Sequence, residues 1–271
     1  MASQMYQLGF IGAGKLAGSV IRGLMRAKFC PPEKIIASEP NEQTRTALKK
    51  ETGVAVIAEN AEVAQKAEVI FIGVKPPMVV SVLTGLKDEL GNKLVISLAG
   101  GVRIASMEKT GGARFMRALT NTPSAICRAA TGFSRGSRTT NDDVDLVKKI
   151  FGAIGVAVEV DEEKIDIITA LSGSGPAFVY TVIEALADGG VKLGLAKDVA
   201  MKLAIQTTLG AAEIMLESKM SPEELRKMVV TPGGTTAAGL AVMEKLGTRE
   251  SLIAAIEAAT KRGQEMGKEN S

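Results

Sequence analysis

The stretch Leu8–Ala17, with the sequence LGFIGAGKLA, constrains the fold of this chain more than any other. It reads as a short apolar strand, a glycine turn and the start of a helix expected over Lys15–Lys28, which is how a nucleotide-binding βα unit begins. Gly12 permits the tight turn, and Gly14 lets the backbone approach a pyrophosphate at the helix N-terminus, where free N–H groups favour an anion. The pattern also fits an ordinary strand-to-helix turn, but its flanks favour a dinucleotide site.

Strand and helix patterns alternate through residues 1–162, which predicts a doubly wound α/β domain with a mostly parallel sheet. Ligands in such sheets bind beyond the carboxyl ends of the strands, so the polar and glycine turns after several strands are expected to face one crevice. Lys75 and Gly100 lie in two of these turns. Strands are expected at Leu8–Ile11, Ile35–Ser38, Val54–Ile57, Val69–Val74, Leu94–Leu98, Arg114–Ala118, Thr131–Ser134 and Val156–Val160, the last two as edge strands.

Glu39 directly follows one of the expected strands, where an acidic residue holds the ribose 2′-hydroxyl of NAD. A carboxylate there would repel the 2′-phosphate of NADP and so favour NADH. A solvated loop glutamate is the alternative, and Ser38, Asn41 and Arg45 offer a phosphate other partners. Ser38 and Glu39 are therefore candidate cofactor-binding residues, and Asn60 is the expected N-cap of a later helix.

Residues 163–271 contain no strand pattern and predict an all-α domain. The helix expected over Ala177–Gly189 is apolar around most of its circumference, and a domain of about 100 residues offers little to cover it. We therefore expect a second subunit to cover this helix, giving a homodimer. The alternative is a central helix wrapped by its own neighbours. Helices are expected at Lys164–Leu171, Ala177–Gly189, Lys197–Glu217, Pro222–Met228, Thr236–Lys245 and Leu252–Gly267, with a capping box at Ser221–Glu224.

Two glycine-rich segments, at 171–176 and 231–236, interrupt the helical half. Each is expected to form a loop that offers backbone N–H groups and hydroxyls at a helix N-terminus, an arrangement suited to a carboxylate. Plain interhelical turns are the alternative.

Composition narrows the function classes. The chain has no histidine, so its chemistry works without an imidazole and without the commonest metal ligand, and no metal site is expected. Cys30 and Cys127 form neither a disulfide framework nor a metal cluster, which favours reduced thiols in the cytoplasm. A dispersed net charge of +3 argues against nucleic acid. The N-terminus lacks a secretory pattern, and Lys75 breaks the apolar region Val69–Leu86, so no membrane span is expected.

Several motifs together resemble the Δ1-pyrroline-5-carboxylate reductases, over nearly the whole chain and in the same order. These motifs are GFIGAGKLA, VKP at Val74–Pro76, NTP at Asn121–Pro123, LSGSGPAF at Leu171–Phe178, EALADGGVKLGL at Glu184–Leu195 and TPGGTT at Thr231–Thr236. The resemblance implies reduction of the cyclic imine pyrroline-5-carboxylate to proline with NADPH or NADH. It also implies a Rossmann domain followed by a helical dimerisation domain, with dimers often assembled by fives into a decamer.

The resemblance also assigns the site residue by residue. Thr231, Gly233, Gly234 and Thr235 would bind the substrate, and the Thr236 hydroxyl would meet its ring nitrogen as the catalytic group. A protonated imine accepts hydride directly, which agrees with a chain that lacks histidine. Cofactor binding would fall to Gly12, Ala13, Gly14, Lys15 and Leu16 at the pyrophosphate, to Asn60 near the adenosine ribose, and to Val74, Lys75, Pro76, Ala99 and Gly100 at the nicotinamide end, with Asn121 close by.

The chain departs from the family pattern at Thr231, where a serine is more common, and at Arg226-Lys227, where many members carry Lys-Asp. Glu39 also differs from the loops of NADPH-preferring members. Two other functions compete with the reductase. A β-hydroxyacid dehydrogenase of the 6-phosphogluconate type shares the domain plan, but its helical-domain lysine is not found here. A non-catalytic dinucleotide sensor would bind the cofactor without turnover.

Overall fold

The strands form a single mixed sheet in the computed structural model, which describes residues 5–269. The order across the sheet is β3-β2-β1-β4-β5-β6-β7-β8, and all neighbours are parallel except β6 and β7. The predicted doubly wound, mostly parallel sheet is therefore confirmed. The strands are β1 (Tyr6–Ile11), β2 (Ile35–Ser38), β3 (Ala55–Ile57), β4 (Ala67–Ile72), β5 (Leu94–Ser97), β6 (Arg114–Leu119), β7 (Ala129–Arg135) and β8 (Gly155–Glu159).

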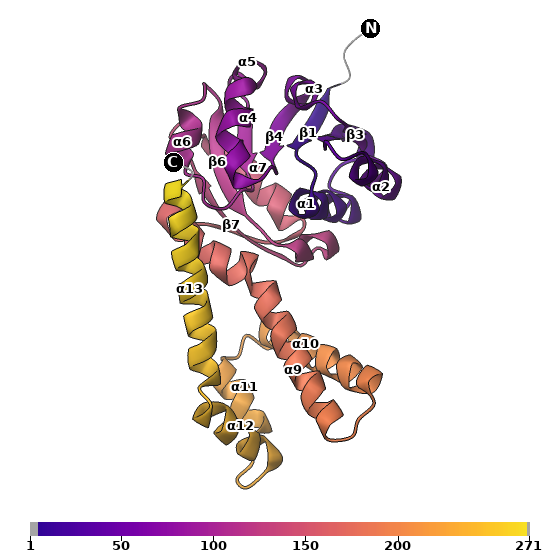
Figure 1. Ribbon diagram of the computed structural model, residues 1–271, viewed down its shortest axis with the longest axis vertical. Helices are drawn as coiled ribbons and strands as arrows, with labels where there is room; N and C mark the ends of the chain where they lie inside the picture. The colour runs from indigo at the N-terminus through magenta and orange to yellow at the C-terminus, as the bar shows by residue number, and fades with distance from the viewer. Residues whose placement is uncertain (1–4, 270–271) are drawn as a thin grey trace. The chain divides into compact units, whose positions relative to one another are not determined.

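Helices cover both faces of this sheet (Figure 1), which explains why β4 reads as a continuous apolar run. Successive residues of β4 alternate between two cores, with Phe71 in one and Ile70 and Ile72 in the other. Phe71 stacks on Phe10 with ring centroids 4.5 Å apart and meets Phe151 edge-on. The helices here are α1 (Lys15–Arg26), α2 (Glu42–Thr52), α3 (Asn60–Lys66), α4 (Val79–Gly85), α5 (Lys87–Leu90), α6 (Ile104–Glu108), α7 (Asn141–Gly152) and α8 (Ile165–Ile168).

The prediction that β7 lies at an edge is wrong. β7 pairs with β6 on one side and β8 on the other, and the edges of the sheet are β3 and β8. Phe133 of β7 is fully buried, as an interior strand requires. The short, mixed sequence AATGFSR concealed this position because only one of its side chains is large and apolar.

The glycine-rich segment 171–176 is helical, so the prediction of a loop there is wrong. Residues 169–173 form a single π-helical turn, Ser174 is a bend, and α9 (Gly175–Lys192) begins directly after it. The Ser174 N–H donates to the Thr169 carbonyl at 2.8 Å, and Pro176 lies in the first turn of α9, where no N–H is needed. The predicted loop is therefore reduced to a single bend between two helical stretches.

Contacts within the chain define two units, which are described separately. The first comprises residues 1–174 and 258–271, and the second comprises residues 175–257. The first unit therefore extends beyond the predicted boundary at residue 162, because Ile165 and Asp166 are buried in it. The helices of the second unit are α9, α10 (Lys197–Ser218), α11 (Pro222–Val229), α12 (Thr235–Lys245) and the start of α13 (Thr248–Glu269), whose last part belongs to the first unit.

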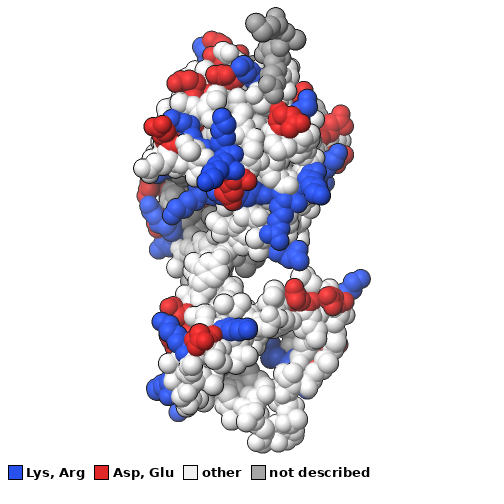
Figure 2. Space-filling model, turned by 90° about the vertical axis from the view of Figure 1, so that its right-hand side faces the viewer, with Lys and Arg blue, Asp and Glu red and all other residues white. Residues whose placement is uncertain are grey.

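The second unit leaves much apolar surface exposed. Its buried core consists of Ala187, Ala200 and Ala204, between α9 and α10, whereas Tyr180 and Leu203 on the same helices are more than half exposed. Figure 2 shows broad areas of its surface without Lys, Arg, Asp or Glu. A domain that buries so little of its own apolar surface needs a further partner.

Two stretches among the described residues, Glu162–Lys192 and Lys197–Ser218, are long and apolar enough to cross a bilayer by length and composition alone. Neither stretch was predicted as a candidate span, because the expectation rested on residues 69–86 alone. The same composition is expected of helices that pack against a second subunit.

Asn121 provides a test of the π-helical turn. Its Nδ2 donates to the Ser172 carbonyl at 3.0 Å and its Oδ1 accepts the Ala130 N–H at 3.2 Å. Asn121→Asp keeps the acceptor but sets a carboxylate oxygen against the Ser172 carbonyl, so the free energy of unfolding is expected to fall by about 1–3 kcal/mol. Urea unfolding measures this fall. Asn92→Asp, at an exposed position, is the control, and equal stability of the two variants would contradict the role assigned to Asn121.

Candidate active site

The glycine turn after β1 is tied to the end of β2. The N–H groups of Gly12 and Ala13 both donate to the Ser38 carbonyl, at 3.0 and 2.9 Å. Gly12 has a φ of +85°, which favours glycine. Gly14 is the N-cap of α1, and a Cβ at Gly14 would meet nothing within 4 Å. The start of this helix is therefore open, with backbone N–H groups available to an anion.

The turn after β4 packs directly on the glycine turn. A Cβ added to Gly73 would collide with the Gly12 carbonyl oxygen and lie 2.7 Å from the Ala17 Cβ, and one added to Gly12 would lie 2.8 Å from a Val74 methyl group. The Gly73 N–H donates to the Ile11 carbonyl at 2.8 Å. Backbone therefore packs against backbone at this point, and only glycine fits at position 73.

Two of the candidate cofactor-binding residues, Ser38 and Asn60, are hydrogen-bonded to each other. The fully buried Ser38 donates from Oγ to Asn60 Oδ1 at 2.7 Å. This bond occupies the Asn60 side chain, and the N-cap of α3 is Glu59. The prediction of Asn60 as the N-cap is therefore wrong by one residue, and Ser38 orients the Asn60 amide.

The Glu39 carboxylate lies at the start of α2, half-buried. Its Oε1 accepts the Asn41 N–H at 3.1 Å, and Asn41 is the N-cap of α2. Arg45 Nη1 donates to the carbonyls of Glu39 and Pro40 at 2.8 and 2.7 Å. The arginine is therefore held by backbone oxygens of this loop and forms no ion pair with the Glu39 carboxylate.

The candidates for the nicotinamide end follow β4, β5 and β6, whose parallel pairing places their carboxyl ends at one edge of the sheet. Lys75 is exposed in the turn after β4. The buried Ala99 donates its N–H to Ser97 Oγ at 3.3 Å, and a Cβ at Gly100 would lie 3.7 Å from Thr169. Asn121 is buried, and both ends of its amide bond to the protein backbone. The predicted convergence of these turns is therefore found in the first unit.

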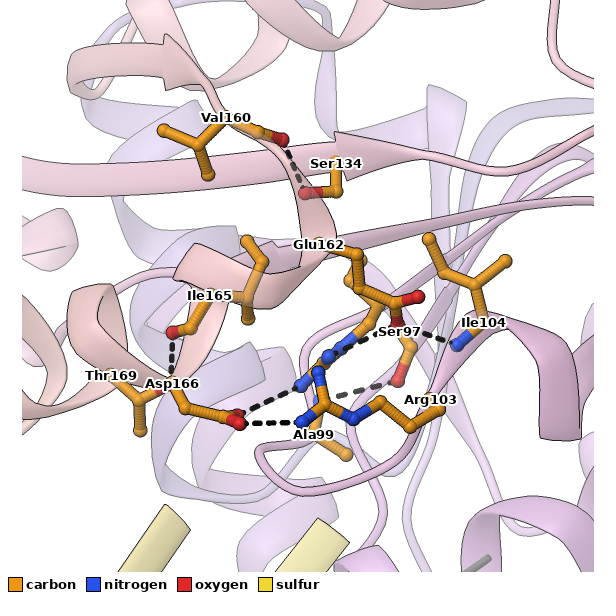
Figure 3. Close-up of polar contacts among 11 residues, drawn as sticks. Ser97, Ala99, Arg103, Ile104, Ser134, Val160, Glu162, Ile165, Asp166 and Thr169 are labelled. Carbon is orange, nitrogen blue, oxygen red and sulfur yellow. Dashed lines mark hydrogen bonds and ion pairs between the residues drawn. The ribbon is translucent and has the colours of Figure 1, made fainter. Parts of the chain in front are cut away.

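A buried polar cluster beside these turns was missed by the sequence analysis. Arg117 of β6 has an exposed fraction of 0% and forms ion pairs with Glu162 and Asp166, and Asp166 also pairs with Arg103 (Figure 3). Burial lowers the pKa of the Arg117 guanidinium, and the two carboxylates oppose that fall. The available signal was an arginine within the apolar strand RFMRAL.

The substrate candidates lie in the second unit, at the start of α12. Gly233 has a φ of +72°, and Gly234 is the N-cap of α12 and donates its N–H to the Thr231 carbonyl at 3.0 Å. Thr235 and Thr236 are the first two residues of the helix, so their N–H groups have no partner within it. The segment 231–236 therefore forms the predicted helix N-terminus. The capping box that starts α11, Ser221 with Glu224, is also confirmed.

Comparison with known protein families gives a match for the N-terminal half of the chain and another for the C-terminal half. Residues 7–101 match a family described as NADP oxidoreductase, coenzyme F420-dependent, which gives the class of nucleotide-dependent oxidoreductases. Residues 162–266 match the pyrroline-5-carboxylate reductase dimerisation family.

Similarity to individual proteins extends over the whole chain. A pyrroline-5-carboxylate reductase from Pisum sativum is 42% identical over 97% of this chain and 97% of its own length, and one from Methanosarcina acetivorans is 40% identical over 97% and 98%. The crystal structure of a Plasmodium falciparum pyrroline carboxylate reductase with NADP bound has a TM-score of 0.88 at 32% identity, over 97% of this chain and 98% of that one.

The chain belongs to the pyrroline-5-carboxylate reductase family. The resemblance found in the sequence is thereby confirmed, and the 6-phosphogluconate type of dehydrogenase is not supported.

Gly73→Ala tests the backbone contact at the nucleotide site. The added methyl group pushes the Gly12 turn away from β4, so we expect a loss of about 1–3 kcal/mol in the free energy of unfolding and weaker nucleotide binding. Thermal unfolding and calorimetric titration with NADH measure the two effects. The control is Gly85→Ala in α4, where a Cβ meets nothing within 4 Å. Wild-type nucleotide affinity in Gly73→Ala would contradict the contact's role.

Proposed function

We propose that this chain reduces pyrroline-5-carboxylate to proline, with the reduced nucleotide bound at the Gly12–Gly14 turn and the substrate bound at the start of α12. The observation that carries the proposal is the occurrence of two open helix N-termini, at Gly14 and Gly234, in a chain related to these reductases over nearly its full length. Each helix start suits an anion, a pyrophosphate in the first case and the substrate carboxylate in the second.

The proposed reaction does not require a strong general acid from the protein. Reduced nicotinamide supplies a hydride when bound, and a protonated cyclic imine accepts it at carbon without further activation. The residues of the chain bind and orient the substrate: the N–H groups of Thr235 and Thr236 hold the carboxylate, and the Thr236 hydroxyl fixes the ring nitrogen. A chain without histidine is sufficient for this work.

Glu39 favours NADH over NADPH in our proposal. Its carboxylate stays at the end of β2 through its bond with the Asn41 N–H, where it is placed to accept from a ribose 2′-hydroxyl and to repel a 2′-phosphate. Arg45 is engaged with backbone carbonyls and so offers a phosphate less. The proposed preference concerns this chain and not the Plasmodium falciparum relative, which was solved with NADP bound.

Homodimerisation through α9 and α10 completes the proposal. Exposed apolar residues on both helices lie within the part of the chain that matches the dimerisation family. Five such dimers form a decamer in the fuller proposal, and sedimentation equilibrium distinguishes the two assemblies. We place the enzyme in the cytoplasm, where the free Cys30 and Cys127 stay reduced, with no nucleic acid or membrane as partner.

Glu39→Ser is expected to shift the cofactor preference towards NADPH. Loss of the carboxylate removes the repulsion of the 2′-phosphate, so the ratio of kcat/KM for NADPH to that for NADH is expected to rise about tenfold or more. Parallel assays of NADH and NADPH oxidation measure the ratio. Glu42→Ser, at an exposed position in the first turn of α2, is the control. A wild-type enzyme that strongly prefers NADPH would contradict the role of Glu39.

Thr236→Ala is expected to lower turnover about tenfold to a hundredfold, because it removes one oriented hydrogen bond to the ring nitrogen. Thr236→Ser keeps the hydroxyl and is expected to keep most of the activity. Steady-state kinetics with pyrroline-5-carboxylate give kcat and KM for both variants. Unchanged values in Thr236→Ala would remove this hydroxyl from the mechanism.

A further inference from the structure

The buried polar cluster consists of Arg103, Arg117, Glu162 and Asp166. It holds the C-terminal end of the turn that follows β5. Glu162 Oε1 accepts the Ile104 backbone N–H at 2.7 Å and Arg117 Nη1 at 3.1 Å. Asp166 Oδ2 accepts Arg103 Nη2 at 2.9 Å. Arg103 and Ile104 are where the turn ends and α6 begins. Two carboxylates therefore fix the end of the turn (Figure 3). Arg117 is hydrogen-bonded to Glu162 and forms an ion pair with Asp166.

The near end of the same turn is fixed by the strand next to Arg117. Ser97 lies directly opposite Arg117 in the register of β5 and β6, and both side chains are fully buried. Ser97 Oγ accepts the Ala99 N–H at 3.3 Å. Ala99 and Gly100 are therefore held between two fixed points.

The last part of α13 packs on the cluster within the first unit. A Cβ at Gly263 would lie 3.4 Å from the Asp166 Cβ, and one at Gly101 would lie 2.9 Å from the Met266 Cβ. The absence of side chains at Gly101 and Gly263 lets this helix approach the turn closely. The cluster thus joins the β5 turn to two segments that are distant in sequence.

Stability alone does not account for an arginine at position 117. Burying a guanidinium carries a desolvation cost that hydrophobic residues of similar volume avoid, often with a gain in stability. Among the described residues, moreover, Arg117 Nε and Nη2 have no hydrogen-bond acceptor. What the charge provides is a fixed geometry for Glu162 and Asp166.

We propose that Arg117 and Glu162 are positioning residues that hold Ala99 and Gly100 at the nicotinamide end of the site. The inference rests on the proposed function only for the placement of Ala99 and Gly100 beside the nicotinamide. Neither charged residue touches the reacting atoms in this proposal. They act through the β5 turn, so their loss affects the nicotinamide end of the nucleotide and leaves the adenosine, and the pyrophosphate bound at the Gly12 turn, unchanged.

Glu162→Ala tests this directly, because it removes the acceptor shared by Ile104 and Arg117. Calorimetric titration compares NADH with ADP-ribose, which has the adenosine and phosphates but no nicotinamide. We expect NADH to bind about threefold to tenfold more weakly and ADP-ribose to bind as in the wild type. We also expect kcat per nucleotide-binding site to fall about tenfold, since small displacements at the reacting centre are costly.

Glu162→Gln and Glu163→Ala are the matched controls. Gln at position 162 retains an acceptor and is expected to recover most of the NADH affinity, and the exposed neighbour Glu163 is expected to be silent. Arg103→Gln, at a partly exposed position, provides a second variant if Glu162→Ala does not fold, with the same loss expected for NADH alone. Equal weakening of NADH and ADP-ribose, or wild-type affinity for both, overturns the proposal. A wild type that binds NADH without reducing pyrroline-5-carboxylate overturns the proposed function instead, and the affinity comparison still decides the role of the cluster.

Discussion

Close contact between two backbone turns shapes the proposed nucleotide site of this protein. Gly73, after β4, lies against the Gly12 carbonyl with no room for a Cβ. The Gly12 turn also donates the N–H groups of Gly12 and Ala13 to the Ser38 carbonyl at the end of β2. Three neighbouring parallel strands are thereby locked together at their carboxyl ends. The open start of α1 follows from this arrangement, because Gly14 enters the helix only when Gly12 makes the turn.

Much of the first unit could be predicted from local sequence. The residue limits of β2 agree with the prediction, because turn residues bound this short apolar run. The fold class and the convergence of the glycine turns followed from the alternation of strands and helices. The interior position of β7 could not be predicted, because strand order depends on long-range pairing that a short strand with one large apolar residue does not reveal.

Side-chain roles were harder to predict than elements. The segment 171–176 has the composition of a loop, yet Ser172 lies in a π-helical turn, and its carbonyl accepts from Asn121 Nδ2. Asn60 has the residue type of an N-cap but bonds to Ser38 from a neighbouring strand. Arg117 has partners that are 45 residues or more away in sequence, the nearer being Glu162. Each role is set by a tertiary contact, which single-sequence patterns do not contain.

The helices of the second unit fit both the expected dimer and the proposed chemistry. These helices bury little apolar surface alone and match the dimerisation part of the family, and one of them begins at the loop that suits the substrate carboxylate. A substrate that is already electrophilic needs an anchor and an oriented hydroxyl more than an acid, and in our proposal the start of α12 and the Thr236 hydroxyl supply these without a histidine.

The most direct test of this account is the fate of the hydride. The enzyme is supplied with pyrroline-5-carboxylate and NADH that carries deuterium at both positions of nicotinamide C4, and the product is analysed by mass spectrometry and NMR. The account predicts proline with a single deuterium on the former imine carbon, formed in equal amount to the nucleotide oxidised. Unlabelled proline would contradict direct transfer, and nucleotide binding without any proline would favour a dinucleotide sensor.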